Sequence, residues 1–346
     1  NRFKNCGFSK PKALIEVEKK PIIFYLLDEI DSHCEAMNSL DKNIIVYIPY
    51  NIEYKNFNFE EKLRNNYKNI NFKFLILEKN TDGAAETINI AIKKLDRKDM
   101  NLTNSIDTPV ICLDSDNFYL FDIVKAWNGQ NCVFTFDDNT NDEAIYSYVS
   151  CEENSNKIID IKEKVKISNK ACTGAYGFSS INQLEEYTSK ILKLNKRQKS
   201  EFYTSGVIKE MLNDDIHFKE INIDNRYYFS LGTPKQVDEY ENPYIFDLDG
   251  TLVDTDNIYV DVWSFIMKKY NLAVDSDFFK YFIQGKNDFA FLKHIFSEID
   301  EELIEEISNL KDNLFVEYLG KHGKDITIPG TMNFFEKNKN RRMCIV

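Results

Sequence analysis

An apolar run that ends in two aspartates, residues 110–118, constrains the fold more than any other stretch of this sequence. Four apolar or small residues run directly into Asp114, Ser115 and Asp116, a pattern typical of a buried strand that ends at a polar edge. The ends of strands in α/β sheets form the crevice where ligands bind. Two carboxylates so close together can hold Mg²⁺, although an acidic turn has the same pattern.

Strand-like and helix-like patterns alternate along the first part of the chain. Strands are expected at 44–48, 74–77 and 110–113, and helices at 21–40, 60–67 and 84–95. This alternation predicts a mostly parallel sheet with helices on both faces. After residue 127 we expect short strands separated by polar turns at 132–136, 145–149, 157–161, 174–178, 218–223 and 227–231, with helices at 181–194 and 200–212.

A polar stretch that ends in proline, residues 238–243, predicts a domain boundary. We therefore expect two domains, 1–242 and 243–346, and a length of 346 residues provides a core for each. Both ends look cut, because the chain opens without an initiator Met and closes on an apolar run that resembles the start of a strand.

Composition excludes several classes of function. A net charge of −12 argues against a nucleic-acid partner, because such proteins carry a basic stripe. The seven cysteines are scattered, which favours reduced thiols and a cytoplasmic location without a zinc site. No apolar run reaches the length of a membrane span and no signal peptide is recognisable, so we expect no membrane partner.

The most specific motif begins at Asp247, where an apolar strand runs into Asp-Leu-Asp-Gly-Thr. This arrangement supplies a carboxylate nucleophile, a second carboxylate at Asp249 for proton transfer, and a glycine for a tight turn. The motif resembles that of the haloacid dehalogenase superfamily phosphatases. The resemblance implies an aspartyl-phosphate on Asp247, leaving-group protonation by Asp249, Mg²⁺ at both residues, and a helical cap at about 255–324. The family's later motifs would lie beyond Val346, so this half is expected to be crippled.

The first 240 residues contain several short patches in a defined order. They are Asn1-Arg2-Phe3, Lys10-Pro11-Lys12, Pro21-Ile22, Thr81 with Gly83-Ala84, residues 113–117, residues 173–178, Glu201-Phe202-Tyr203 and Leu231-Gly232-Thr233-Pro234. Together they resemble the sugar-phosphate nucleotidyltransferases, which implies a Rossmann-like mixed sheet. The first strand and the glycine-rich loop of that family are missing here.

The resemblance implies roles for residues near the nucleotide. Arg2 would neutralise the β- and γ-phosphates, and Lys12 would bridge the α-phosphate and the incoming phosphate. The turn at Thr81, Gly83 and Ala84 would abut the base and ribose. Asp116 corresponds to the metal aspartate of the family.

The acceptor side and the second metal ligand are less defined. Gly174, Tyr176 and Glu201 would line the acceptor pocket, although Tyr176 suits a core position equally well. The family often has a second metal aspartate where this chain has Ser230. Asp224 is the nearest carboxylate, and Asp114, otherwise assigned to the nucleotide, is the alternative.

These features predict a bifunctional enzyme. With Mg²⁺, it would transfer a nucleotidyl group, CMP from CTP rather than UMP from UTP, to a phosphorylated sugar or polyol for surface polysaccharide synthesis. The alternatives are a uridylyltransferase, a nucleotide-sugar binding module that serves the phosphatase, and an inactive nucleotide sensor. The sequence leaves open whether the chain forms a homodimer.

Overall fold

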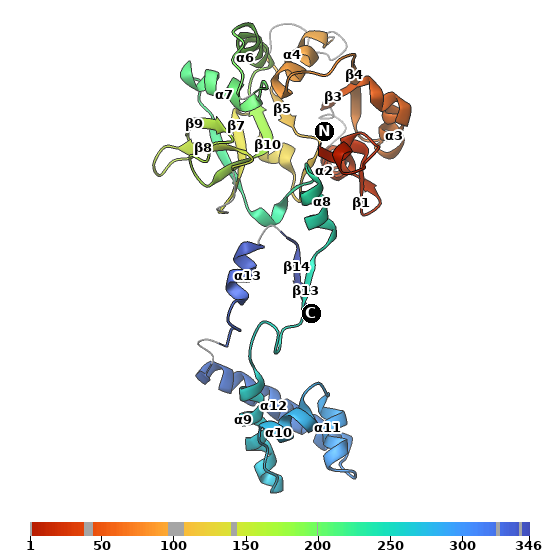
Figure 1. Cartoon of the computed structure of the whole chain (residues 1–346), viewed down its shortest axis with the longest axis vertical. Helices are drawn as coiled ribbons and strands as arrows, with labels where there is room; N and C mark the ends of the chain where they lie inside the picture. Colours follow the sequence, from red (N-terminus) through yellow and green to blue (C-terminus); the bar gives the residue numbers. More distant parts are fainter. Residues whose placement is uncertain are drawn as a thin grey trace. The chain divides into compact units, whose positions relative to one another are not determined.

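The computed structural model describes residues 2–37, 44–95, 107–139, 144–198, 200–322, 326–338 and 341–346. It divides the chain into two compact units, Asn1–Glu241 and Asn242–Val346 (Figure 1). Among the described residues, no helix combines the length and the apolar character needed to cross a membrane.

The first unit is built on a six-stranded mixed sheet. Its strands are β5 (Val110–Leu113), β7 (Cys132–Asp137), β8 (Ser147–Cys151), β9 (Ile158–Glu163), β10 (Lys170–Phe178) and β11 (Lys219–Ile223). The order is β11-β7-β10-β8-β9, with β5 also paired to β10, and only β7 and β11 run parallel. The mixed sheet that the family resemblance implies is therefore confirmed. The mostly parallel pairing expected for the strands at 44–48, 74–77 and 110–113 does not hold for β5, which pairs antiparallel with β10. Short connections such as that between β8 and β9 allow only antiparallel pairing.

Three smaller strand pairs accompany the central sheet. They are β1 (Glu16–Val17) with β2 (Lys20–Pro21), β3 (Ile45–Asn51) with β4 (Asn71–Leu77), and β6 (Asn117–Tyr119) with β12 (Tyr228–Ser230). The β3–β4 pair is parallel, as the alternating pattern predicts. The β6–β12 pair was not predicted, because three residues of β6 are too short to show a period in the sequence.

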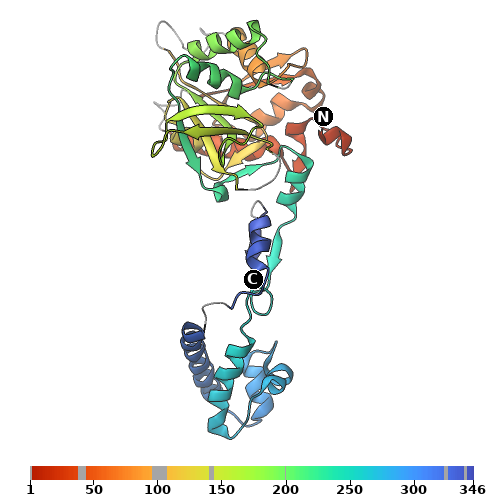
Figure 2. The same cartoon turned by 60° about the vertical axis from the view of Figure 1, so that its left-hand side comes forward.

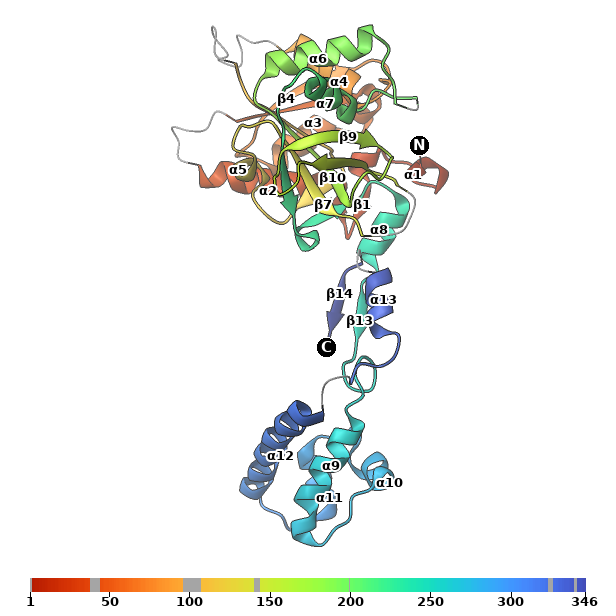
Figure 3. The ribbon, with the colours of Figure 1, turned by 90° about the vertical axis from the view of Figure 1, so that its left-hand side faces the viewer.

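Helices cover both faces of the central sheet. The α-helices of the first unit are α1 (Arg2–Asn5), α2 (Ile22–Ala36), α3 (Phe59–Asn66), α4 (Ala84–Lys94), α5 (Ile123–Trp127), α6 (Ile181–Lys193), α7 (Thr204–Asn213) and α8 (Pro234–Glu241). Helices α4, α6 and α7 lie together and bury one core with the sheet (Figures 2 and 3). Helix α2 contributes to a second core. Helices predicted at 21–40, 60–67 and 84–95 correspond to α2, α3 and α4, although residues 38–40 lie outside the described part.

The second unit contains a strand pair and a helical part. Its elements are β13 (Tyr244–Phe246), α9 (Asp256–Met267), α10 (Ser276–Phe278), α11 (Asp288–Ile295), α12 (Glu301–His322), α13 (Thr331–Lys337) and β14 (Met343–Ile345). Strands β13 and β14 pair in parallel. The predicted apolar stripe of α9 forms the helical core, where Trp263 is 1% exposed and packs edge-on against Phe291.

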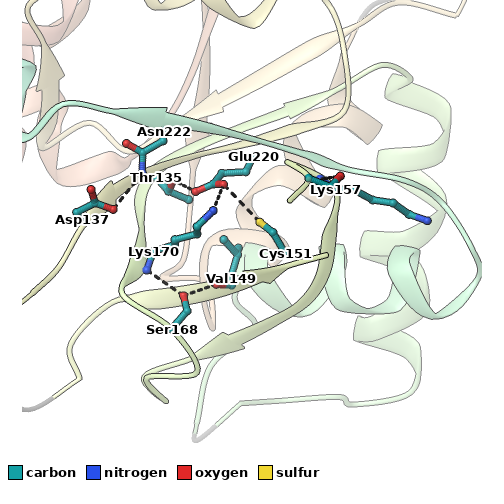
Figure 4. A network of polar contacts seen from close by, with 10 residues as sticks. Thr135, Asp137, Val149, Cys151, Lys157, Ser168, Lys170, Glu220 and Asn222 are labelled. Atoms are coloured by element: carbon teal, nitrogen blue, oxygen red, sulfur yellow. Dashed lines mark hydrogen bonds and ion pairs between the residues drawn. The ribbon is translucent and has the colours of Figure 1, made fainter. Parts of the chain in front are cut away.

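An ion pair between a partly exposed lysine and a buried glutamate joins the middle of the sheet to its edge (Figure 4). Glu220 on β11 accepts hydrogen bonds from the Thr135 hydroxyl at 2.8 Å and from the Cys151 thiol at 3.4 Å, and it pairs with Lys170. The Glu220 side chain is 5% exposed. Burial alone would raise the pKa of Glu220, but the hydrogen bonds from Lys170 and Thr135 outweigh it and hold the pKa below its usual value.

We expect Lys170→Met to destabilise the first unit by about 1–3 kcal/mol at pH 7, because it leaves a buried carboxylate without its cation. The pKa of Glu220 is lower in the folded protein than in the unfolded chain, so ionised Glu220 stabilises the fold at pH values above the unfolded pKa. This stabilisation is lost as the pH falls through the folded pKa. The difference between variant and wild type should therefore shrink below about pH 4. Urea unfolding at pH 7 and pH 3.5 measures it.

Lys162→Met is the matched control. Lys162 lies on β9 of the same sheet, is half exposed, and reaches Asp160 only at 3.9 Å. Its loss should change the free energy of unfolding by less than about 0.5 kcal/mol. Equal effects of the two substitutions would contradict a stabilising role for the Lys170–Glu220 pair.

Candidate active site

The turn at residues 114–117, which is closed by a hydrogen bond from the Asn117 amide to the Asp114 carbonyl at 3.2 Å, carries Asp114 and Asp116. It connects β5 to β6, and backbone hydrogen bonds hold it on two sides. The Asp114 amide donates to the Gly174 carbonyl at 3.0 Å, and the Leu231 amide donates to the Asp116 carbonyl at 2.8 Å. The turn is therefore fixed between β10 and the end of β12, and its side chains project from a rigid frame.

Lys12 meets this turn from the other end of the sequence. It begins a short 3-10 helix (Lys12–Leu14) whose next residues, Ala13, Leu14 and Ile15, are buried in the core. This apolar anchor fixes the backbone beside Lys12, as the proline and the apolar run predict. The Lys12 Nζ lies 2.5 Å from the Asp116 Oδ2. Two residues that the sequence places about 100 positions apart therefore form one ion pair.

The ion pair borders a hollow of about 240 Å³. Five residues predicted for the site line it, namely Lys12, Asp114, Asp116, Gly174 and Tyr176. Tyr176 is only 8% exposed and packs within the core behind the sheet. It is therefore both a wall of the hollow and a core residue, so the two interpretations of Tyr176 are compatible.

Two glycines make room for the two carboxylates. A Cβ at Gly174 would lie 2.4 Å from the Asp114 Oδ2, and Gly174 also has a positive φ of +86°. A Cβ at Gly232 would lie 2.4 Å from the Asp116 Oδ2. A Cβ atom essentially never comes this close to another non-bonded heavy atom, so any side chain at either position displaces an aspartate.

The charge around Asp114 is unbalanced. Asp114 lines the hollow and remains exposed to solvent. Partial desolvation of the carboxyl group, together with the negative charge of Asp116, raises the pKa of Asp114 above its usual range, and Lys12 only partly opposes the shift. A cation between the two carboxylates would remove the repulsion.

These residues fit a divalent metal ion. Asp114 and Asp116 supply hard oxygen ligands from one turn, and Mg²⁺ is commonly held by one or two carboxylates together with substrate phosphates. Within the described part of the chain, His, Cys, Asp and Glu side chains nowhere gather in threes as a ready-made metal site. The arrangement therefore suits a metal ion that arrives with a phosphate ligand.

Asp224 does not take part in the hollow. It caps the 3-10 helix Asn225–Tyr227 by accepting from the Arg226 amide, and its carboxylate lies 2.7 Å from the Arg226 Nη2. These interactions with Arg226 lower the pKa of Asp224 to about 2. Since a carboxylate held in this way is not aimed at the turn of Asp114 and Asp116, the structure does not support its prediction as a metal ligand.

The turn predicted for the nucleotide lies outside the lining of the hollow. Thr81 bonds the Thr87 hydroxyl, and Ala84 begins α4. At Gly83 a Cβ would lie 2.5 Å from the Phe202 carbonyl oxygen. Glycine is thus required at residue 83 because the chain passes close to the backbone of Phe202 there. Glu201, next to Phe202, is exposed and also outside the lining.

Arg2 belongs to α1, and its side chain lies outside what the structure describes. Asp247 and Asp249 belong to the second unit. Both are exposed, and Asp249 accepts a hydrogen bond from the Thr255 hydroxyl at 2.9 Å. Asp247 directly follows β13, so the motif does lie at a strand end, as its sequence predicts.

Sequence reasoning missed part of the wall of the hollow. Glu163 at the end of β9 accepts a hydrogen bond from Ser147 and another from Ser205 at 3.1 Å. Tyr203 accepts a hydrogen bond from the Lys164 Nζ at 2.8 Å. Residues such as Glu163 and Ser147 carry no local signal, because only the pairing of β8, β9 and β10 brings them beside the turn. Tyr203 does lie in a patch that the sequence singled out.

A phosphate-handling α/β enzyme is the class that the mixed sheet, the lysine–aspartate pair and the hollow define. The model of the nucleotidyl transferase family matches residues 2–243, and the chain belongs to this family. None of the curated proteins matches it.

One solved structure supports the fold, and two others are similar to this chain. The chain is similar to a nucleoside-diphosphate-sugar pyrophosphorylase from Vibrio cholerae RC9, with 16% identity, a TM-score of 0.57, and coverage of 68% of this chain and 93% of that one. It is also similar to the inositol-1-phosphate CTP transferase from T. maritima, with 13% identity, a TM-score of 0.48, and coverage of 68% and 86%. A third is the CTP:phosphocholine cytidylyltransferase from Streptococcus pneumoniae, with 15% identity, a TM-score of 0.45, and coverage of 67% and 89%.

Proposed function

We propose that the first unit transfers a nucleotidyl group from a nucleoside triphosphate to a phosphorylated sugar or polyol. The observation that carries this proposal is the Lys12–Asp116 ion pair of 2.5 Å at the edge of the hollow. It places a cation and a candidate metal ligand together where β5 ends. Phosphoryl and nucleotidyl transfer depend mainly on positioning and on neutralising charge.

The reaction needs little covalent chemistry from the protein. An oxygen of the acceptor phosphate attacks the α-phosphorus, the bond from the α-phosphorus to the bridging oxygen breaks, and pyrophosphate leaves with that oxygen. Lys12 would hold the α-phosphate and the acceptor phosphate together. Asp116 and Asp114 would hold Mg²⁺, which neutralises phosphate charge when bound. Tyr176 and Gly174 would border the acceptor.

We favour CTP as the donor. This preference rests on the form of the segment at residues 10–17, Lys-Pro-Lys-Ala-Leu-Ile-Glu-Val, which resembles bacterial cytidylyltransferases. The protein should release pyrophosphate when incubated with Mg²⁺, CTP and a member of a panel of hexose and polyol phosphates. Release with UTP or dTTP alone would overturn the cytidylyl assignment, and no release with any triphosphate would overturn the proposed function.

A clamp centred on Arg197 would hold the nucleotide turn. Its Nη2 donates to the Asp82 Oδ2 at 2.8 Å, and its guanidinium lies 4.2 Å from the ring centre of Phe202. The Phe202 amide donates to the Asp82 carbonyl at 2.7 Å. Tyr203 borders the hollow. The short segment 200–203 therefore contacts the predicted nucleotide turn through Phe202 and the acceptor side of the hollow through Tyr203.

We expect Arg197→Ala to raise KM for the nucleotide about tenfold with a smaller effect on kcat, because the turn loses its anchor while Lys12 and Asp116 are untouched. Steady-state pyrophosphate release measures both constants. Arg226→Ala is the control, since Arg226 pairs with Asp224 away from the hollow. An unchanged KM for the nucleotide in Arg197→Ala would show that this turn does not take part in nucleotide binding.

A second candidate function belongs to the second unit. Asp247 and Asp249 follow β13, which pairs in parallel with β14, and Thr255 orients Asp249. This arrangement favours a phosphomonoester phosphatase of the haloacid dehalogenase type. Because the later motifs that the resemblance implies are not among residues 247–346, we expect only weak hydrolysis of p-nitrophenyl phosphate with Mg²⁺. This activity should disappear in Asp247→Asn and persist in the control Asp254→Asn. Equal rates in both variants would argue against an aspartate nucleophile at residue 247.

A further inference from the structure

Asn117 has an unusual environment within the turn. It is 7% exposed, and its Nδ2 donates to the Thr173 carbonyl at 2.8 Å. Its Oδ1 is buried and accepts no hydrogen bond from any residue that the structure describes. A buried carbonyl oxygen without a partner costs about 1–3 kcal/mol, so a well-folded protein rarely keeps one without use.

The orientation of this amide is fixed. Exchanging its oxygen and nitrogen would place two oxygens against each other at Thr173, so the hydrogen bond to Thr173 determines which atom is left over. The backbone of Asn117 is already paired with Ser230 in the β6–β12 ladder. The unpartnered Oδ1 therefore does not serve the sheet.

Asn117 lies beside the candidate metal carboxylates. A Cβ at Gly174 would be 2.4 Å from the Asp114 Oδ2 and 2.6 Å from the Asn117 Nδ2, so the Asn117 amide group and the Asp114 carboxylate border the same small space, with the amide nitrogen on the Gly174 side. Asn117 and Asp116 are consecutive, and both contribute to the hollow. The turn thus offers two carboxylates and one neutral amide oxygen, all hard ligands of the kind that Mg²⁺ and Mn²⁺ prefer.

We propose that Asn117 Oδ1 is a third protein ligand of the divalent cation, bound together with Asp114 and Asp116. This inference rests on the proposed function for the identity of the site. Ser230 pairs with Asn117 across the β6–β12 ladder and stands where the family often has a metal-binding carboxylate. In this inference the Asn117 amide supplies the oxygen that Ser230 lacks.

Binding of Mn²⁺, followed by the decrease in its electron paramagnetic resonance signal, tests this assignment without relying on turnover. We expect Asn117→Ala in the full chain to weaken Mn²⁺ binding about 10- to 30-fold, with and without CTP. Asn117→Asp, which keeps an oxygen in place, should bind Mn²⁺ within about threefold of wild type or more tightly. The control is Asn89→Ala, because Asn89 is equally buried but bonds Thr188 and Ser189 outside the hollow.

Three outcomes would overturn the inference. The first is Mn²⁺ affinity unchanged within twofold in Asn117→Ala. The second is a rise in KM for the acceptor alone, which would make Oδ1 an acceptor contact. The third is absence of Mn²⁺ binding by the wild-type chain. Should Asn117→Ala fail to fold, weak Mn²⁺ binding by a folded Asn117→Asp would contradict the inference. Mn²⁺ binding that depends on Asn117, without pyrophosphate release from any triphosphate, would refute the proposed function and leave this inference standing.

Discussion

Lys12→Met is expected to lower kcat/KM for pyrophosphate release about a thousandfold, which corresponds to about 4 kcal/mol of transition-state stabilisation. The substitution keeps the aliphatic stem and removes the charge that the structure places 2.5 Å from Asp116. Steady-state release of pyrophosphate with Mg²⁺ and the preferred triphosphate measures the loss. Since Ala13, Leu14 and Ile15 carry the packing of this segment, thermal stability should change little.

Lys10→Met is the matched control. Lys10 lies two residues earlier, is 43% exposed, and pairs with Glu16 at 2.6 Å instead of with the turn. Its loss should leave kcat/KM within about twofold of wild type, because exposed pairs contribute little. A comparable loss of activity in both variants would show that the segment needs positive charge in general and that Lys12 has no specific role.

Gly232→Ala is the second substitution with a large expected effect, a decrease in kcat of about a hundredfold. The added Cβ would lie 2.4 Å from the Asp116 Oδ2, so the carboxylate must move by about an ångström and leave Lys12. Gly232 has an ordinary φ, so the methyl group strains no backbone. We expect little change in melting temperature and a weaker response to Mg²⁺ in rate measurements.

Gly206→Ala provides the comparison for this effect. Gly206 lies in α7, and a Cβ there would meet nothing closer than 3.8 Å, in the Gln198 side chain. Alanine in a helix should stabilise the protein by up to about 1 kcal/mol and leave the rate unchanged. If Gly232→Ala turned over as fast as Gly206→Ala, the position of Asp116 would not matter for the reaction.

The local pattern at residues 110–118 was sufficient to predict a strand that ends in a turn with a pair of carboxylates. The same holds for Lys12, because a proline and an apolar run restrict its backbone whatever the rest of the chain does. Joining the two required the ordered patches, since no local pattern reports that residue 12 meets residue 116. The resemblance to a family supplied that long-range information.

Other parts of the site could not be predicted, for a physical reason. Strand direction depends on connections and on partners distant in sequence, so the antiparallel pairing of β5 with β10 was missed. Glu163 reaches the hollow only through the β8–β9 hairpin and the short bridge of that hairpin to β10. Asp224 was the nearest carboxylate in sequence, but an arginine two residues later holds it elsewhere.

The ion pair between Lys12 and Asp116 also bears on the order in which substrates would bind. Without substrate, the two groups neutralise each other. If Asp116 held a metal ion, the Lys12 ammonium would lose this partner and would be free to bind a phosphate. A nucleotide that arrives with its metal would thus create the cationic site for the second substrate. Such an exchange predicts an ordered sequential mechanism with the nucleotide first, recognisable from competitive product inhibition by the nucleotidyl product against the nucleotide alone.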